Sequence, residues 1–261
     1  MGRIGLTTSS YDQPAVLVGG DPATLYVRSY LLIRTVVGLL GVALPTVLIL
    51  ADWLLIGGEA ELRGSLSAYY HSPARDLFVG TLFVVGVLLM TYLAAQRDTW
   101  DFWLSLVAGV SALAVALLPT PRPGLPATAR RCGEEPRPRG CSGVQQALGE
   151  TLTGVLHFVA AAVFILCLAA MCFVFAHRAV RYDGALGVAR LFRGAGVVIL
   201  LAVGWAGLGS LAGIEVDGLA ALYLGEVVAV YAFGVCWFVT GRRLWLRLVP
   251  SAWGPRGSAA A

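Results

Sequence analysis

Long apolar stretches separated by short polar ones dominate this chain and predict membrane-spanning helices. There are six of them, and each has the roughly 20 apolar residues that a helix rising ~1.5 Å per residue needs to cross a bilayer. They occupy residues 30–57, 74–95, 100–119, 149–176, 192–213 and 219–241. The sequence therefore predicts an all-α polytopic membrane protein, a bundle of six transmembrane helices.

The segments outside the spans are short. We expect one transmembrane domain, residues 30–243, between an N-terminal cytoplasmic segment, 1–29, and a cytoplasmic interfacial tail, 244–261. Residues 1–29 lack the apolar core of a signal peptide, so the first span is expected to act as an uncleaved anchor. Residues 242–253 mix Arg with Trp and Leu, which predicts an amphipathic segment in the inner interface. Residues 120–148 are rich in Pro, Arg, Ala and Gly and predict an irregular, mobile outer loop.

Composition and charge agree with this class and suggest an orientation. Hydrophobic residues make up 58% of the chain, charged residues 13%, and the mean hydropathy is +0.78. All 19 basic residues are Arg, a usage typical of GC-rich bacterial genomes. Twelve of them lie on the side of both termini and seven on the other, which places the termini in the cytoplasm and the protein in the cell membrane. They are scattered, so no nucleic-acid surface is predicted.

Two of the five cysteines lie outside the apolar spans. Cys132 and Cys141 enclose a polar stretch of the outer loop, CGEEPRPRGC, whereas Cys167, Cys172 and Cys236 fall within spans. A disulfide between Cys132 and Cys141 is expected if this loop faces the oxidising side. Two free thiols are the alternative. No motif for a cofactor is found, and none is predicted.

A small set of polar groups falls within or just outside the outer half of the bundle. Because ionisable groups in a bilayer are costly, they are candidates for function. The acids and imidazoles are Asp52, His71, Asp76, His157 and Glu226, joined by the hydroxyls of Ser67, Tyr69, Tyr70 and Tyr223. From these we expect a ligand site made of Ser67, Tyr70, His71, Asp76, His157 and Glu226.

His157 and Glu226 lie at the same depth, each about 10 Å from the outer interface on a different span. Equal depth predicts a hydrogen bond or ion pair between them. Such a pair is either part of a polar cavity or a purely structural contact between helices, where these bonds average only ~0.6 kcal/mol. The sequence leaves both readings open.

Ser67 and His71 form a second pattern, because a helical turn would put them on one face. With Asp76 nearby, this spacing resembles the Ser-xxx-His and Asp elements of ceramidase-like membrane hydrolases, in which three His residues hold zinc. The His-xxx-His pair of those enzymes is missing here. Ser67, His71 and His157 are therefore candidate catalytic residues. No metal site is predicted, although His71, His157 and Asp76 or Glu226 would offer enough ligands for zinc.

Two local patterns concern the helices themselves. Ser72 and Pro73 followed by Asp76 predict a helix start, with a capping hydroxyl, a proline at the first helical position and an acid in the first turn. Gly209 and Gly213 form a small-xxx-small pair that favours close packing of the fifth span.

Several of these positions resemble the DRAM/Sfk family of six-span membrane proteins, which includes autophagy modulators and proteins of glycosylphosphatidylinositol-lipid maturation. The resemblance covers roughly residues 30–243. It rests on Ser65-Leu-Ser67 with Pro73, on Leu156-His157-Phe158 with the small residues after it, and on Glu226 followed by aromatics and Arg242-Arg243. It is closest to uncharacterised bacterial relatives with SxSAYY-type loops, and it departs from the family in the long Cys-bearing outer loop.

Three functions are compatible with these features. The first is a protein that binds membrane lipids and holds a headgroup in an outward-facing polar cavity formed by the Ser67–His71 loop, His157 and Glu226. The second is a membrane-embedded lipid hydrolase or acyl transferase, with Ser67 as nucleophile and a histidine as base. The third is a proton-coupled permease in which Glu226 titrates. The resemblance favours the first.

Overall fold

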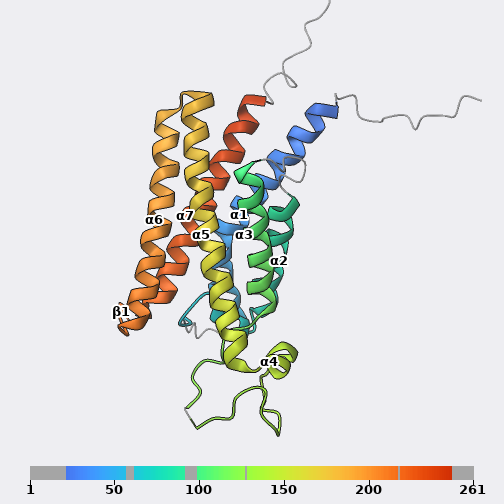
Figure 1. The fold of residues 1–261 in the computed structure, drawn as a ribbon, viewed down its shortest axis with the longest axis vertical. Coiled ribbons are helices and arrows are strands. Elements are labelled where there is room, and N and C mark those ends of the chain that lie inside the picture. Colours follow the sequence, from blue (N-terminus) through green and yellow to red (C-terminus); the bar gives the residue numbers. More distant parts are fainter. Residues whose placement is uncertain (1–21, 57–61, 92–98, 127, 217, 249–261) are drawn as a thin grey trace, which may run out of the picture.

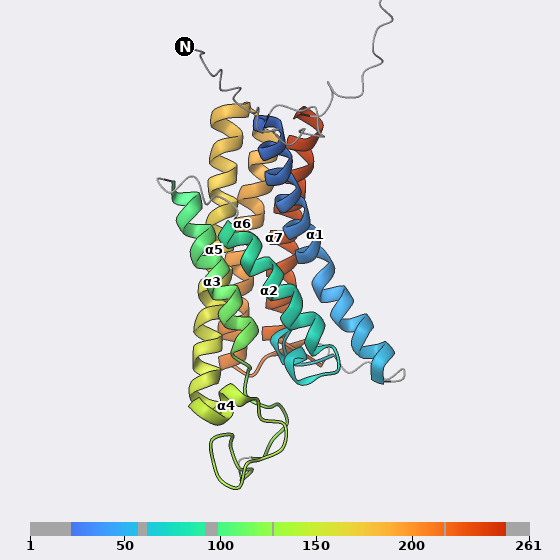
Figure 2. The ribbon, with the colours of Figure 1, turned by 90° about the vertical axis from the view of Figure 1, so that its right-hand side faces the viewer.

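Six long helices, packed side by side and alternating in direction, make up most of the protein (Figures 1 and 2). The computed structural model describes residues 22–56, 62–91, 99–126, 128–216 and 218–248. The long helices are α1 (Pro22–Ile56), α2 (Arg75–Thr91), α3 (Trp100–Leu117), α5 (Glu150–Asp183), α6 (Leu186–Leu211) and α7 (Ala221–Leu248). The short elements are the 3-10 turn η1 (Ser67–His71), α4 (Gly143–Leu148) and a two-stranded hairpin, β1 (Glu215–Val216) and β2 (Leu219–Ala220).

Five helices are long and apolar enough to cross a membrane: α1, α3, α5, α6 and α7. The helical membrane class is thus confirmed, whereas six spans remain a prediction, because α2 has only 17 described residues. The outward faces carry large apolar side chains, among them Leu201, Leu208 and Leu211, which are 68%, 72% and 87% exposed. Such exposure is typical of a surface that contacts lipid rather than water.

Several helices are longer than the apolar pattern predicts. α1 begins at Pro22, a residue favoured at the first helical position, and α7 continues to Leu248. Residues 244–248 of the expected interfacial tail are therefore helical, and the apolar span within α7, Ala221–Arg242, ends next to the predicted residue 241. Arg, Leu and Trp all tolerate helix, and the next helix-breaking residue is Pro250. Residues 1–21 and 249–261 lie outside the described part of the chain.

The helices form a closed ring in which each packs on its neighbours: α1 on α2 and α7, α7 on α6, α6 on α5, α5 on α3, and α3 on α2. The crossing of α1 and α7 is built on glycine. A methyl group added at Gly38 would collide with the backbone of Phe238, and one added at Gly234 would collide with the backbone of Val42. The two backbones therefore approach as closely as small residues allow.

One residue of the predicted Gly209/Gly213 pair makes a close helix contact, and the other does not. Gly209 packs directly against Ala221 of α7, so this part of the prediction describes a true helix contact. Gly213 has open space around it and adopts a φ of +63°, in the left-handed region that ends a helix. The second close contact comes from Gly225 of α7, which meets Ala202 and Ala206 of α6.

Residues 120–148 are more ordered than their composition predicts. They contain α4, whose capping residue Ser142 accepts a hydrogen bond from the Gln145 backbone N–H. The Gln145 side chain in turn accepts one from the Ser142 N–H, which completes a capping box. The expectation of an irregular loop is therefore wrong for residues 143–148.

Candidate functional site

The connection between α1 and α2 folds inward as a buried segment, Ser65–Ser72, which we call the mouth segment. It lies at the end of the bundle that also carries α4, opposite the described start of α1 and end of α7 (Figure 2). Leu66, Ser67 and Tyr69 are all at most 5% exposed. Serine side chains support the turn: Ser65 Oγ accepts from the Ala68 N–H, and Ser72 Oγ donates to the Tyr69 carbonyl. Ser72 Oγ also accepts from the Ala74 N–H, in line with its predicted capping role.

Glu226 of α7 holds the first half of the mouth segment. The Leu66 N–H donates to Oε2 of Glu226 at 2.5 Å, and the Ser67 hydroxyl donates to Oε1 at 3.4 Å. Glu226 is partly buried. No cation pairs with it among the described residues. The carboxylate is therefore held by neutral donors alone.

His71 holds the second half of the mouth segment. Its Nε2 lies 2.8 Å from the Thr120 carbonyl, which can only accept, so this nitrogen carries the proton. Burial lowers the pKa of the His71 imidazole below its usual value, and the hydrogen bond to Thr120 opposes this shift only in part. Ser67 and His71 thus contact different partners, and the described chain has no hydrogen bond between a serine hydroxyl and a histidine.

His157 of α5 is fully buried and faces the connector that follows α3. Its Nδ1 donates to the Leu118 carbonyl, while Nε2 has no hydrogen-bond partner within the described chain. No hydrogen bond or ion pair joins it to Glu226. The predicted His157–Glu226 pair is therefore wrong. The two side chains lie at similar depth but point to different neighbours, since depth along a helix does not fix direction around it.

The residues from Leu118 to Arg122, which we call the connector, gather most of the polar contacts at this end. The Thr120 carbonyl accepts from both His71 and the buried Gln145 amide, whose Nε2 lies 2.9 Å away. With the Leu118 carbonyl bound to His157, the connector ties α4, α5 and the mouth segment together. Neither Gln145 nor Thr120 was a sequence candidate; only the capping-box spacing around Gln145 could have indicated its role.

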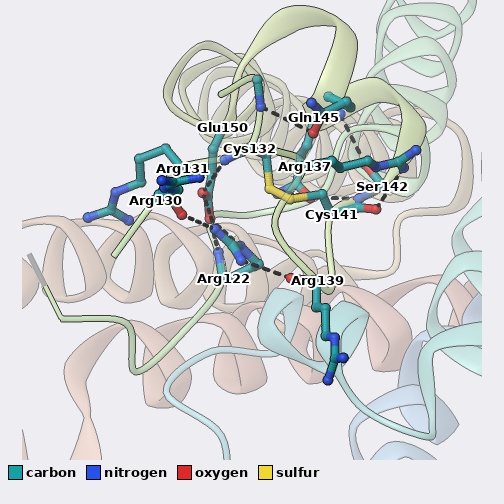
Figure 3. The surroundings of a disulfide bond; sticks show 12 residues. Arg122, Arg130, Arg131, Cys132, Arg137, Arg139, Cys141, Ser142, Gln145 and Glu150 are labelled. Carbon is teal, nitrogen blue, oxygen red and sulfur yellow. Dashed lines mark hydrogen bonds and ion pairs between the residues drawn. A yellow bond between two sulfur atoms is a disulfide. The ribbon is translucent and has the colours of Figure 1, made fainter. Parts of the chain in front are cut away.

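The loop of residues 120–148 is fastened to α5 by a buried ion pair (Figure 3). Glu150 is 2% exposed, and its Oε1 accepts from the Arg122 backbone N–H at 2.7 Å and from Arg122 Nε at 3.2 Å. Its Oε2 accepts from Arg122 Nη2 and from the Cys132 N–H, each at 3.1 Å. The same guanidinium donates to the Arg130 and Arg139 carbonyls. The sequence analysis missed this pair, because Glu150 fell within the predicted apolar span 149–176 and was not a candidate.

The disulfide lies beside this ion pair. Cys132 and Cys141 are bonded in the structure, and Cys132 is 2% exposed. Figure 3 shows the two sulfur atoms next to Arg137 and Gln145, where the loop returns toward α4. The disulfide and the Arg122–Glu150 pair therefore constrain the same stretch of chain.

The remaining candidates are dispersed. Tyr70 is buried and accepts a hydrogen bond from Arg75, whose guanidinium also stacks on its ring at 4.5 Å. Asp76 is exposed in the first turn of α2. Nowhere in the described chain do three His, Cys, Asp or Glu residues come together as metal ligands. The zinc alternative built on His71, His157 and Asp76 or Glu226 is thus not supported by the geometry.

A tyrosine pair lies next to Glu226. The hydroxyls of Tyr69 and Tyr223 are neighbours, and both side chains are almost fully buried. Burial raises the pKa of Tyr69 above its usual range, and Tyr223 and the carboxylate of Asp52 add to the effect. Asp52 is itself paired with Arg63 at 3.0 Å. Tyr223 interacts electrostatically with Glu226, and its hydroxyl interacts with that of Tyr69.

This arrangement defines a polytopic helical membrane protein with a buried polar cluster at one end. The chain belongs to the family described as Protein of unknown function (DUF998), whose model matches residues 39–240. The match covers all the helices that carry the cluster. Neither the curated proteins nor the solved structures yield a match.

Proposed function

We propose that this DUF998 protein is a six-span protein of the cell membrane that binds a lipid headgroup beside Glu226, with both termini in the cytoplasm. The domain extends over residues 30–243, and α2 supplies the sixth span. In support, α2 runs antiparallel to α1 and α3, and the apolar sequence continues beyond its last described residue, Thr91. The resemblance to DRAM/Sfk proteins agrees with a role at lipids.

The observation that carries the proposal is the environment of Glu226. A carboxylate in a membrane span is costly unless a partner compensates its charge, and among the described residues only Leu66 and Ser67 donate to it. It lies about 24 Å along α7 from Arg242, a separation that supports a position near the outer border of a ~30 Å hydrocarbon core. An ammonium group from a headgroup would compensate the charge of Glu226.

Aromatic rings near a carboxylate also favour binding of an ammonium group. Cations, and quaternary ammonium groups in particular, bind well to the faces of tyrosine rings. Tyr69 and Tyr223 bring two such rings to the Glu226 cluster. The headgroup class that fits is therefore one with an amine, such as ethanolamine or choline.

The test uses the full-length protein purified in a mild detergent, with bound lipids measured by mass spectrometry. Glu226→Gln keeps the shape of the side chain and removes its charge. We expect it to lower the amount of co-purifying amine-headgroup lipid by about tenfold, because hydrogen bonds to charged groups are worth ~1.5–3 kcal/mol. Asp76→Asn, which removes an exposed carboxylate from the same end, is the control and should leave the lipid content unchanged.

The alternatives predict other outcomes. An unchanged lipid content in Glu226→Gln, with loss of proton-coupled uptake in vesicles, would replace this proposal by a permease. A hydrolase with Ser67 as nucleophile and a histidine as base requires these two side chains to be in contact, yet the Ser67 hydroxyl donates to Glu226 and His71 donates to Thr120. The geometry therefore favours binding over hydrolysis.

A further inference from the structure

A cavity lies at the end of the bundle opposite the Glu226 cluster, between the start of α3 and the last turns of α5. Its volume is about 510 Å³. Its polar lining residues are Thr99, Asp101, His177 and Arg178, and its apolar ones are Trp100, Phe173 and Val174. None of these residues belongs to the cluster around Glu226.

The cavity is built on a buried charge pair. Asp101, in the first turn of α3, is 1% exposed, and its Oδ2 lies 2.6 Å from Nη1 of Arg178. This is the one partner of Arg178 within the described chain, and the arginine side chain remains 36% exposed. The pair therefore fixes one edge of the guanidinium and leaves its other edge available to a ligand. Held in this way, Arg178 is preorganised to bind a phosphate with two parallel hydrogen bonds.

The local charge is positive. Arg34 of α1 is 4% exposed, stacks on Phe175 at 4.4 Å and also interacts electrostatically with Asp101. Asp101 is thus shared by two guanidinium groups, so the described side chains around it carry a surplus of positive charge. An anionic ligand is favoured over a neutral one.

The depth of this cavity and the distribution of its polar and apolar lining residues fit a phospholipid. Arg178 lies about 42 Å along α5 from Glu150, close to the ~40–45 Å thickness of a bilayer including its headgroups. Phe173 and Val174 lie about 6 Å deeper than His177 and Arg178 along the same helix. The cavity is therefore polar at headgroup level and apolar toward the membrane interior. Trp100, 80% exposed at its rim, is the kind of residue that is enriched at the membrane interface.

We propose that this cavity binds the phosphate of an anionic phospholipid, with Arg178 and His177 as its ligands and Asp101 as the residue that positions Arg178. The acyl chains then lie against Phe173 and Val174. This site is independent of the one at Glu226: it lies at the other end of the bundle and takes a ligand of the opposite charge.

The experiment is a titration of the full-length protein in detergent with phosphatidylglycerol and with phosphatidylcholine, followed by native mass spectrometry. Arg178→Gln alone would leave Asp101 buried without its partner and endanger folding. The double variant Asp101→Asn/Arg178→Gln removes both charges, and His177→Gln leaves the ion pair intact. Arg181→Gln, three residues further along α5 and outside the cavity lining, is the matched control.

We expect the wild type to prefer phosphatidylglycerol and the double variant to bind it about tenfold more weakly, as for the loss of a charge-assisted contact. His177→Gln should weaken binding by about threefold, and Arg181→Gln should bind as the wild type does. Equal binding of the two lipids by the wild type would overturn the proposal, as would wild-type affinity in both cavity variants. Equally tight binding of glycerophosphoglycerol, which lacks acyl chains, would show that the ligand is a soluble phosphate ester instead.

Discussion

A single carbonyl group connects three parts of the end of the bundle that carries α4. The Thr120 oxygen accepts from His71 of the mouth segment and from Gln145 of α4, and its own residue belongs to the connector after α3. A carbonyl has two lone pairs, so both acceptor positions are filled. Both donors are buried or partly buried, so loss of either hydrogen bond would leave its donor without this partner.

The lowered pKa of His71 makes this contact sensitive to pH. Burial disfavours the protonated imidazole in the folded state, whereas the unfolded chain takes up a proton near pH 6.5. Below that pH the unfolded state therefore binds more protons, and the free energy of unfolding falls as the pH is lowered. Above pH 6.5 the lowered pKa of His71 has no effect on the free energy of unfolding.

His71→Gln should reduce this pH dependence. The glutamine amide can still donate to the Thr120 carbonyl but does not titrate. We expect the difference in melting temperature between pH 7.5 and pH 5 to be smaller in His71→Gln than in the wild type, measured by thermal unfolding in detergent. An identical pH dependence in both proteins would show that His71 does not cause it.

The candidate residues show how much of the site could be predicted from the sequence. Apolar length gave the depth of His157 and Glu226, and the rarity of acids in spans identified Glu226 as a polar position. Ser67 and Glu226 were both candidates, but two other partners could not be predicted, because His157 donates to the Leu118 carbonyl and Glu226 accepts from the Leu66 N–H. Every residue offers the same backbone groups, so the sequence carries no signal for them.

At the scale of the elements, close backbone contacts hold the helices together where no hydrophobic force between helices is available within lipid. Gly38 is the clearest case, since a methyl group there would meet backbone atoms of α7 that cannot rotate away. Gly204 of α6, by contrast, has open space around it.

Gly38→Ala should therefore destabilise the protein by about 1–3 kcal/mol, the range for overpacking. Gly204→Ala, the matched control in another helix interior, should be neutral or stabilise by up to ~1 kcal/mol through the higher helix propensity of alanine. Chemical unfolding in mixed micelles measures both. Similar values for the two variants would contradict the close crossing of α1 and α7.

Helix existence was easier to predict than helix ends. Apolar length predicted all six long helices, but α7 runs past Arg242 because nothing in its sequence stops it there. α4 was missed because it has only six residues and no apolar period, although Ser142 and Gln145 have the spacing of a capping box. Amphipathic composition around residues 242–248 indicated the interface and could not distinguish a separate segment from the continuation of a helix.

For the whole molecule, the disulfide and the polar clusters give the bundle two distinct ends. The Cys132–Cys141 bond, α4 and the Glu226 cluster lie at one end, and the described start of α1 and end of α7 lie at the other (Figure 1). Disulfides persist on the oxidising side of a membrane. The bond and the distribution of arginines therefore support the same proposed orientation, although they are independent signals.

Reporter fusions test this orientation and the six-span count together. Alkaline phosphatase folds only outside the cytoplasm, and green fluorescent protein exported by the same route fluoresces only within it. We expect phosphatase inserted after Gly124, an exposed position with open space around it, to be active, and green fluorescent protein to fluoresce at either terminus. If α2 did not cross, five spans would separate the termini, and only one terminal fusion would fluoresce. Fluorescence at both termini with an inactive phosphatase at Gly124 would instead place the disulfide loop in the cytoplasm and remove the oxidising environment that the Cys132–Cys141 bond requires.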